Sequence, residues 1–430
     1  MSSTAQDATE RPALWSVDEH LDDILRKIRP LEPIELQLLD AQGCVLVEDV
    51  TVPAPLPPFD NSSMDGYAVR TADVREASEE FPAVLTVVGD IAAGGEGPLA
   101  LGPGEAARIM TGAPLPPGAE AVVPVEWTDG GLGGGPAEAM PAPGATEVRV
   151  FRPAEARAHV RAKGSDVGAG ELALAAGTVL GPPQLGLLAA IGRATVPVRP
   201  RPRVVVLSTG SELVPPGEEL TAGRIHDSNS FVLAACAVDA GALAYRAGTV
   251  HDDPESLRAT LEDQLIRADL VVTSGGVSVG AYDVVKEALS GLTEEEGRVD
   301  FRRLAMQPGK PQGFGRIGPD RIPLFALPGN PVSAYVSFEL FVRPAVRALM
   351  GLEPRDRRTM RAKCAEAVES SPRGRRQYLR GRYADGTVST VGGSGSHLVK
   401  ALAEANALIV VPEDSTSVPA GAEVEVILLG

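Results

Sequence analysis

The stretch from Arg203 to Leu349 decides the fold. It contains RVVVLSTGSEL (203–213), DLVVTSGG (269–276) and IPLFALPGNP (322–331), each an aliphatic run that stops at glycine, serine or proline. Segments with helical spacing of apolar residues lie between them, at 229–241, 253–268 and 282–292. Strands that alternate with amphipathic helices predict a doubly wound, mainly parallel α/β domain.

Smaller β-rich sections flank this domain. Short β runs between glycine and proline at 81–126 predict a β module, and similar pieces after Arg357 predict a small C-terminal β domain. Near the start, SVDEHLDDILRKI (16–28) predicts a helix in which Ser16 is the N-cap and Glu19 its capping-box partner. The expected fold class is therefore multidomain α/β plus β.

Composition excludes several classes of protein. The 57 acidic residues exceed the 40 basic ones and give a net charge of −17, which repels nucleic acid and anionic membrane surfaces. No apolar run approaches the roughly 18 residues of a membrane span. The three cysteines form no C-x-x-C pair, which argues against a disulfide framework or a zinc site. We expect a cytoplasmic protein that binds neither nucleic acid nor membrane.

The three strand ends of the α/β domain are the first candidate site. Ligands of such folds bind beyond the carboxyl ends of the strands, where backbone N–H groups can face an anion. One such turn is more often structural, but three at one sheet edge favour function. In the middle turn the candidate substrate contacts are Ser274, Gly275, Gly276 and Ser278.

Carboxylates cluster near the same strand ends. Glu212, Asp227, Asp252 and Asp283 are candidate ligands of a Mg²⁺ ion that would bridge them to phosphate oxygens. Glu212 and Asp283 are also candidate catalytic residues. For Asp253 a helix-capping role ahead of Pro254 is the favoured interpretation.

Polar loops outside this domain carry further candidates. In PPFDNSSMDGYAV (57–69), Asp65 is the candidate for chemistry, whereas Asp60 and Asn61 have a turn-stabilising alternative. Thr111 lies in a second tight loop. VRAKGSDVGAG (160–170) adds three candidate substrate contacts, which are Arg161, Lys163 and Asp166.

Two segments are ambiguous. The five arginines from Arg373 to Arg382 are consistent with either a solvated hairpin or an anion pocket. The low-complexity stretch 128–148 predicts a surface loop with no apolar residues to anchor it. The five histidines show no H-x-x-x-H spacing, and neither a G-x-S-x-G elbow nor a P-loop occurs, so covalent serine catalysis and P-loop nucleotide hydrolysis lose support.

Together the motifs resemble the molybdopterin molybdenumtransferase (MoeA) family, which also occurs as the C-terminal domain of gephyrin. HDSN, HDDP, PGKP and GSGSH extend the match across nearly the whole chain. The resemblance implies the last step of molybdenum cofactor synthesis. In that step adenylylated molybdopterin is bound, Mg²⁺-dependent cleavage of its phosphoanhydride releases AMP, and molybdate enters the dithiolene.

The resemblance also implies site residues. It places Asp65, Thr111, Arg161 and Asp166 in one part of the active cleft. The α/β part comprises Glu212, Asp227, Asp252, Asp283, Lys310, Pro328 and Pro331, and Ser396 comes from the last domain.

An elongated four-domain homodimer with its cleft between subunits is implied as well. We place the domains at 13–52 with 163–200, 53–162, 201–353 and 354–430. The upstream adenylyltransferase and recipient molybdoenzymes are further candidate partners. Two residues depart from the family pattern. Gln307 replaces a lysine that is common in the family, and Lys310 or Arg303 could compensate for the lost positive charge. His226 replaces a tyrosine of some relatives.

Two other functions remain open from the sequence. A gephyrin-like scaffold would not need the full set of acids, and adenylyl transfer would not need the additional domains. The chain has both the full set of acids and the additional domains, and these two features favour molybdenum insertion. The choice between molybdate and tungstate stays open.

Overall fold

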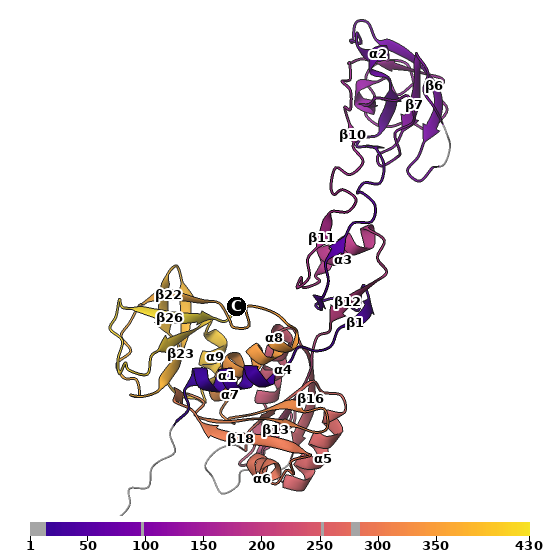
Figure 1. The fold of residues 1–430 in the computed structure, drawn as a ribbon. Coiled ribbons are helices and arrows are strands. Elements are labelled where there is room, and N and C mark those ends of the chain that lie inside the picture. Colours follow the sequence, from indigo (N-terminus) through magenta and orange to yellow (C-terminus); the bar gives the residue numbers. More distant parts are fainter. Residues whose placement is uncertain (1–13, 96–98, 251–252, 277–283) are drawn as a thin grey trace, which may run out of the picture. The chain divides into compact units, whose positions relative to one another are not determined.

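The structure is a computed structural model that describes residues 14–95, 99–250, 253–276 and 284–430 (Figure 1). The chain forms two compact units. The first comprises Met1–Val47, Gly177–Gly181 and Thr195–Gly430, and the second comprises Glu48–Ala176 and Pro182–Ala194. The finer division into four domains stays a prediction.

A six-stranded sheet forms the centre of the first unit. Its order is β16 (Leu243–Val250), β13 (Arg203–Thr209), β17 (Leu270–Ser274), β21 (Ile322–Leu327), β20 (Pro311–Ile317) and β18 (Gly297–Arg303). The first four strands run parallel, and the last two are antiparallel to their neighbours. The predicted α/β fold with a mainly parallel sheet is thus confirmed.

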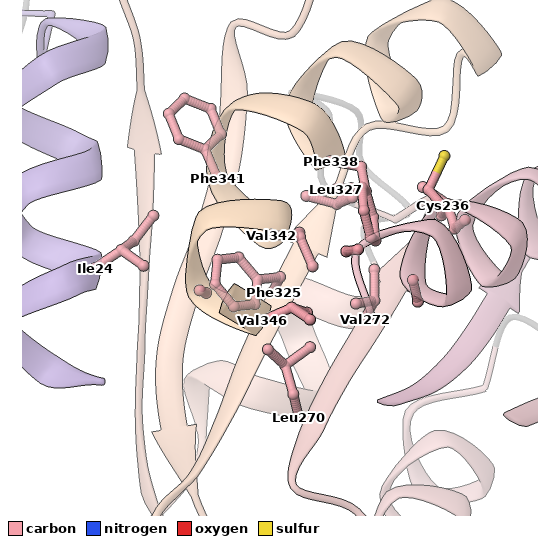
Figure 2. Close-up of a cluster of buried hydrophobic side chains, with 14 of the residues drawn as sticks. Ile24, Cys236, Leu270, Val272, Phe325, Leu327, Phe338, Phe341, Val342 and Val346 are labelled. Atoms are coloured by element: carbon pink, nitrogen blue, oxygen red, sulfur yellow. The ribbon is translucent and has the colours of Figure 1, made fainter. Parts of the chain in front are cut away.

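Alternate strand residues supply two separate cores because successive side chains point to opposite faces. Val204 and Val206 join one cluster, which includes residues of α4 (Asn229–Asp239), α7 (Pro331–Ser337) and α8 (Arg343–Leu349). Figure 2 shows part of this cluster, including Ile24, Phe325 and Phe341. Val205 and Leu207 face the other cluster, beneath α5 (Pro254–Leu265) and α6 (Val284–Ser290).

Helix α1 (Val17–Lys27) begins as the sequence predicts. The Ser16 hydroxyl accepts a hydrogen bond from the Glu19 N–H at 3.1 Å, and the Ser16 N–H donates to the Glu19 carboxylate at 2.8 Å. The buried face of the helix carries Val17, His20 and Ile24. The His20 ring packs edge-on against Phe341, with 4.9 Å between ring centroids.

The apolar spacing of PVSAYVSFELFVRPAVRAL (331–349) predicts one final helix, but in the structure this helix is interrupted. Between α7 and α8, residues Phe338–Val342 form a π-helical turn, η2. Pro344 explains the interruption, because proline lacks the N–H of a regular helix and its ring crowds the preceding turn. Within the described residues no helix is long and apolar enough to cross a membrane.

The described part of the first unit contains three further sheets, of three, six and two strands. The three-stranded sheet has the order β1 (Ile34–Gln37), β12 (Thr195–Arg199) and β2 (Val45–Leu46). In the C-terminal part, β23, β24, β22, β26 and β25 pair in a closed cycle, and β19 adds to β23 from outside. This closed barrel agrees with the predicted C-terminal β domain. The strands of this sheet are β19 (Met306–Gln307), β22 (Thr359–Cys364), β23 (Arg376–Ala384), β24 (Thr387–Thr390), β25 (Ala407–Val411) and β26 (Glu423–Leu428). The remaining elements of the unit are helix α9 (Val399–Glu404) and the two-stranded pair β14 (Leu213–Val214) and β15 (Ile225–His226).

The second unit is built on a five-stranded sheet. Its order is β8 (Ala121–Pro124), β5 (Gly66–Val69), β7 (Glu105–Ile109), β6 (Ala83–Ile91) and β9 (Glu147–Val150), in agreement with the predicted β module. The other elements are β3 (Val50–Thr51), β4 (Asn61–Ser62), α2 (Thr71–Val74), η1 (Val125–Trp127), β10 (Val160–Arg161), β11 (Leu172–Leu174) and α3 (Pro182–Ala190).

The glycine-rich loop is anchored, which corrects the expectation that nothing holds it. The buried Asp129 carboxylate accepts hydrogen bonds from the N–H groups of Gly131 at 2.8 Å, Arg149 at 2.9 Å and Gly133 at 3.2 Å. Met140 also packs against the core of the sheet. Polar anchoring was missed because the prediction considered only apolar residues.

We predict that His20 makes stability depend on pH. Burial, followed by the nearby Arg302 charge, lowers the pKa of His20 from about 6.5 to about 3. A depressed histidine pKa contributes stability that is fully present above about pH 6.5 and is lost as the pH falls through 6.5 toward 3. In His20→Leu, the free energy of unfolding in urea should therefore fall less steeply between about pH 7 and pH 4.

The exposed His397 provides the matched control. His397→Leu should retain the wild-type slope. An unchanged slope in His20→Leu would show that His20 does not control this pH dependence.

Candidate functional site

Three polar loops of the second unit meet around β4. Arg161 of β10 pairs with Asn61 of β4, which brings the 160–170 loop beside the 57–69 loop. The N–H of Gly112 donates to the Ser62 carbonyl at 2.9 Å and adds the loop that carries Thr111. Segments about 50 and 100 residues apart in the sequence, with Asp65, Thr111 and Arg161, thus form one cluster.

Asp65 and Thr111 are in direct contact. The Asp65 Oδ1 atom accepts hydrogen bonds from the Thr111 N–H at 2.7 Å and from its hydroxyl at 2.8 Å. Within the described residues nothing donates to Asp65 Oδ2. The loop therefore holds this half-buried carboxylate in place and leaves one oxygen for a ligand.

Asp60 has a different role. Its carboxylate accepts from Arg157 Nη1 at 2.5 Å and from the Lys163 N–H at 2.7 Å. These bonds, with Arg157 the larger cause, hold the pKa of Asp60 at about 2. The contacts agree with the turn-stabilising alternative. Arg157 was not identified from the sequence, where it has no motif to distinguish it.

The basic candidates next to Asp60 are exposed. The side chains of Arg161, Lys163 and Asp166 all face solvent, and no ion pair within the described residues involves them. Backbone pairing fixes their positions, since the Asp166 N–H donates to the Leu56 carbonyl at 3.0 Å. The loop thus presents two cations and one acid on an ordered backbone.

In the first unit, the three predicted turns lie side by side at the carboxyl ends of the parallel strands. Ser274 of β17 is in register with Ser208 of β13 on one side and with Leu327 of β21 on the other. A Cβ atom at Gly275 (φ +102°) would lie 2.5 Å from the Thr209 carbonyl oxygen. A Cβ atom at Gly329 would lie 3.5 Å from the Gly275 Cα atom. The turns are therefore in backbone contact.

Asn229, at the start of α4, ties two of these turns together. Its Nδ2 donates to Ser274 Oγ at 2.8 Å and to the Gly329 carbonyl at 2.7 Å. The Ser274 hydroxyl is buried and lies 3.4 Å from the Pro328 carbonyl, to which it donates. Ser274 and Pro328 thus belong to one hydrogen-bonded group. Asn229 was missed as a site residue although it ends the HDSN motif.

Two of the four predicted Mg²⁺ ligands, Asp227 and Glu212, lie among the described residues, and their surroundings differ. Asp227 is buried and accepts from the hydroxyls of Ser208 at 3.0 Å and Ser230 at 2.5 Å. Glu212 is exposed, and its carboxylate lies over Gly210, where a Cβ atom would approach Oε2 to 2.6 Å. Among the described residues no hydrogen bond reaches the Glu212 carboxylate.

Several predicted residues lie outside the described part of the chain, namely Asp252, Ser278 and Asp283. No group of three metal-ligating side chains occurs within the described residues, and two of the four predicted Mg²⁺ ligands are not among them. The Mg²⁺ site stays a prediction.

The start of α7 meets the loop of Ser396. Asn330 stands at the N-cap position and Pro331 follows it, but the Asn330 side chain makes no capping bond. Instead, the Val332 N–H donates to the Ser396 carbonyl at 3.0 Å. This bond satisfies one of the unpaired N–H groups at the helix start and places Ser396 next to the 328–331 turn.

Arg380 fixes the loop that leads to Ser396. Its guanidinium donates to the carbonyls of Gly395 at 3.1 Å and Val391 at 3.3 Å, and also to that of Gly393. Arg376 is bonded to Asp18 at 2.8 Å and to Glu413 at 3.0 Å. A third member of the arginine cluster also has a partner, since Arg382 Nη1 donates to the Glu404 carbonyl at 3.4 Å. Arg373 and Arg382 are exposed.

Lys310 and Gln307 lie near the junction of α/β domain and barrel. The Lys310 carbonyl accepts from the Leu304 N–H at 2.8 Å, and Lys310 is half-buried. Gln307 of β19 pairs with Gln377 of β23. Gln307, the first of the two expected departures from the family pattern, is therefore part of strand β19.

Comparisons with known proteins cover nearly the whole chain. Residues 15–192 match "MoeA N-terminal region (domain I and II)", residues 205–348 match "Probable molybdopterin binding domain", and residues 361–429 match "MoeA C-terminal region (domain IV)". The chain is 46% identical to molybdopterin molybdenumtransferase 2 of Mycobacterium tuberculosis over 96% of this chain and 98% of that protein. It is 33% identical to the molybdopterin molybdenumtransferase of Bacillus subtilis, over 96% and 94%.

A solved structure is similar as well. The crystal structure of a molybdopterin biosynthesis MoeA protein from Pyrococcus horikoshii is 34% identical, with a TM-score of 0.74, and the match covers 97% of this chain and 100% of that one.

We predict that Gly275→Ala damages the strand-end turns. The added methyl group would collide with the Thr209 carbonyl, and the positive φ of +102° disfavours a side chain. Overpacking costs about 1–3 kcal/mol and the backbone conformation about 1–2 kcal/mol more. The free energy of unfolding should fall by the sum of these two costs.

Gly217→Ala separates the two effects. Gly217 has a similar φ of +98° and no atom within 4 Å of its Cβ position. This variant should lose only the conformational part, about 1–2 kcal/mol. Equal losses in both variants would contradict the close approach at Gly275.

Proposed function

The chain belongs to the MoeA family of molybdopterin molybdenumtransferases, and from this membership we propose that it is a transferase that inserts molybdenum into molybdopterin during molybdenum cofactor synthesis. The substrates we propose are adenylylated molybdopterin and molybdate, with AMP as the second product. A cytoplasmic location remains part of the proposal. The group of three glycine-bearing turns at one edge of the sheet, with Ser396 beside it, carries the proposal best, because such turns suit a phosphorylated ligand.

The backbone of the strand-end turns would bind and orient the substrate. Asn229 fixes Ser274 relative to Gly329, so the turns keep their positions while the ligand enters. The predicted contacts in this unit remain Ser274, Gly275, Gly276, Ser278, Lys310, Pro328, Pro331 and Ser396. Preorganised N–H groups stabilise developing negative charge without having to move during the reaction.

Mg²⁺ is the proposed metal. Carboxylate oxygens suit this ion, and the exposed Glu212 carboxylate accepts no hydrogen bond in the described part of the chain. Glu212, Asp227, Asp252 and Asp283 would hold the ion. It would neutralise phosphate charge at the bond to be cleaved.

In the second unit, Asp65 is the proposed catalytic carboxylate. Thr111 binds Oδ1 through two hydrogen bonds, which leaves Oδ2 for the reacting group or the metal. Arg161 and Lys163 are exposed cations, and Asp166 lies close to them in sequence. Charge-assisted hydrogen bonds from these cations would bind the anionic substrate.

A homodimer is part of the proposal. Its support is the family membership together with exposed apolar side chains on the edge strand β16 and on α4. These are Phe231, Val238, Leu243 and Tyr245. Light scattering should give twice the 44.7 kDa of one chain, whereas a fully active monomer would contradict this part of the proposal.

We predict that Asp65→Asn slows AMP release about a hundredfold, equivalent to about 3 kcal/mol of transition-state stabilisation. Asparagine retains an oxygen that can accept from Thr111, so the loop should keep its structure while the charge is lost. The measurement is single-turnover AMP release from adenylylated molybdopterin with molybdate present. Glu76→Gln, which removes an exposed charge in the same unit, should release AMP at the wild-type rate.

Removal of divalent cations tests the metal. EDTA should stop AMP release, and excess Mg²⁺ should restore it. EDTA saturated with Mg²⁺ beforehand should have no effect. Undiminished AMP release after exhaustive chelation would rule out the proposed metal dependence.

A further inference from the structure

A hollow lies in the α/β domain, away from the strand-end turns. It encloses about 760 Å³ where α5 and α6 end and where the turn between β20 and β21 projects. Ile322 is the first residue of β21, so the hollow is at the amino end of this parallel strand. The strand-end turns lie at the opposite, carboxyl end. A molecule bound here would leave the proposed active-site turns uncovered.

The floor of the hollow is aliphatic. Its lining includes Leu261, Leu265, Leu289, Leu292, Ile317 and Ile322. Leu261, Leu289 and Ile317 belong to the buried core beneath α5 and α6, which lie side by side in Figure 1. Leu265, Leu292 and Ile322 pack against that core and are half-buried. Ile266, directly after α5, lines the hollow and is 85% exposed.

The rim of the hollow is acidic. Glu262 on α5, Glu295 in the 293–296 turn and Asp320 in the β20–β21 turn are exposed lining residues. In the part of the chain that the structure describes, none of the three has an ion-pair partner. The carboxyl end of α5 adds the negative end of a helix dipole. Arg258 also lines the hollow, but its Nε donates to the Ala288 carbonyl at 2.9 Å.

We propose that this hollow binds a basic amphipathic segment of a partner protein. Aliphatic side chains at helical spacing would enter the hollow, and lysine or arginine side chains on the flanking positions would pair with the rim acids. A volume of about 760 Å³ lies within the range of about 300–1,000 Å³ that is usual for ligand-binding pockets.

The negative charge of the rim favours a basic peptide segment over a small cation, a second copy of the chain, nucleic acid or anionic lipid. The described residues contain no group of three side chains placed to hold one metal ion, so a small cation would not engage all three acids, whereas a segment with several basic residues can. A second copy of the chain would bring the same acidic rim and a net charge of −17. Nucleic acid and anionic lipid are repelled for the same reason. Acids around an aliphatic floor therefore favour a basic peptide segment.

The test uses the full chain and labelled helical peptides of about four turns. One peptide has leucine on one face and lysine on the other, a second replaces lysine with glutamate, and a third scrambles the leucine and lysine positions. Fluorescence anisotropy should detect binding of the leucine–lysine peptide, at least tenfold weaker binding of the scrambled peptide and no binding of the glutamate peptide.

Two variants locate the binding site. Ile266→Asp, and Glu262→Lys combined with Glu295→Lys, should each weaken binding of the leucine–lysine peptide at least tenfold. Leu39→Asp, at a residue that is 83% exposed, is the matched control for the first, and Glu35→Lys is the control for the second. Both controls should bind as the wild type does.

Three results would overturn the proposal. They are equal affinity for the lysine and glutamate peptides, equal weakening in the control variants, and a change of oligomeric mass in Ile266→Asp without a change of peptide affinity. The third result would assign the hollow to a second copy of the chain. AMP release should stay at the wild-type rate in all four variants, so failure of this proposal is distinguishable from failure of the proposed function.

Discussion

The three turns at the carboxyl ends of β13, β17 and β21 can lie in backbone contact only because the middle turn carries glycine at position 275. A side chain there would occupy the space of the Thr209 carbonyl oxygen. Parallel pairing sets the register of the strands, Gly275 allows the turns to approach, and Asn229 bonds two of them together. The contact of Ser396 with α7 depends on the same arrangement, since α7 begins where the third turn ends.

Charge is distributed in a way that suits an acidic chain with an anionic ligand. Several arginines are bonded within the protein, as Arg157 is to Asp60 and Arg376 is to Asp18. Arg161 and Lys163 remain exposed. Net repulsion acts over long distances, whereas an exposed cation on a fixed loop acts over a few ångströms, inside a Debye length of about 8 Å. Local charge can therefore bind what the whole molecule repels.

Much of the fold could be predicted because the aliphatic runs and helical spacings are local patterns. The capping box of Ser16 and Glu19 is of this kind and was confirmed. The helix break at 338–342 has a local cause, Pro344, but it was not predicted because the apolar spacing continues on both sides of this proline. The Asp129 anchor and the Arg380 support of the Ser396 loop could not be predicted, because each joins backbone groups whose positions only the folded chain defines.

Because of strand β19, the C-terminal barrel is not a fully independent module: one of its strands pairs with residues that lie before it in the sequence. Five strands close on themselves and leave few free edges, yet Met306 and Gln307 pair with Arg376 and Gln377 from outside the cycle. A chain cut between the α/β domain and the barrel would strip β23 of this partner and expose unpaired backbone groups. Gene fusion or domain exchange at this boundary would thus need to carry residues 306–307 along, although they lie about 50 residues before the barrel begins.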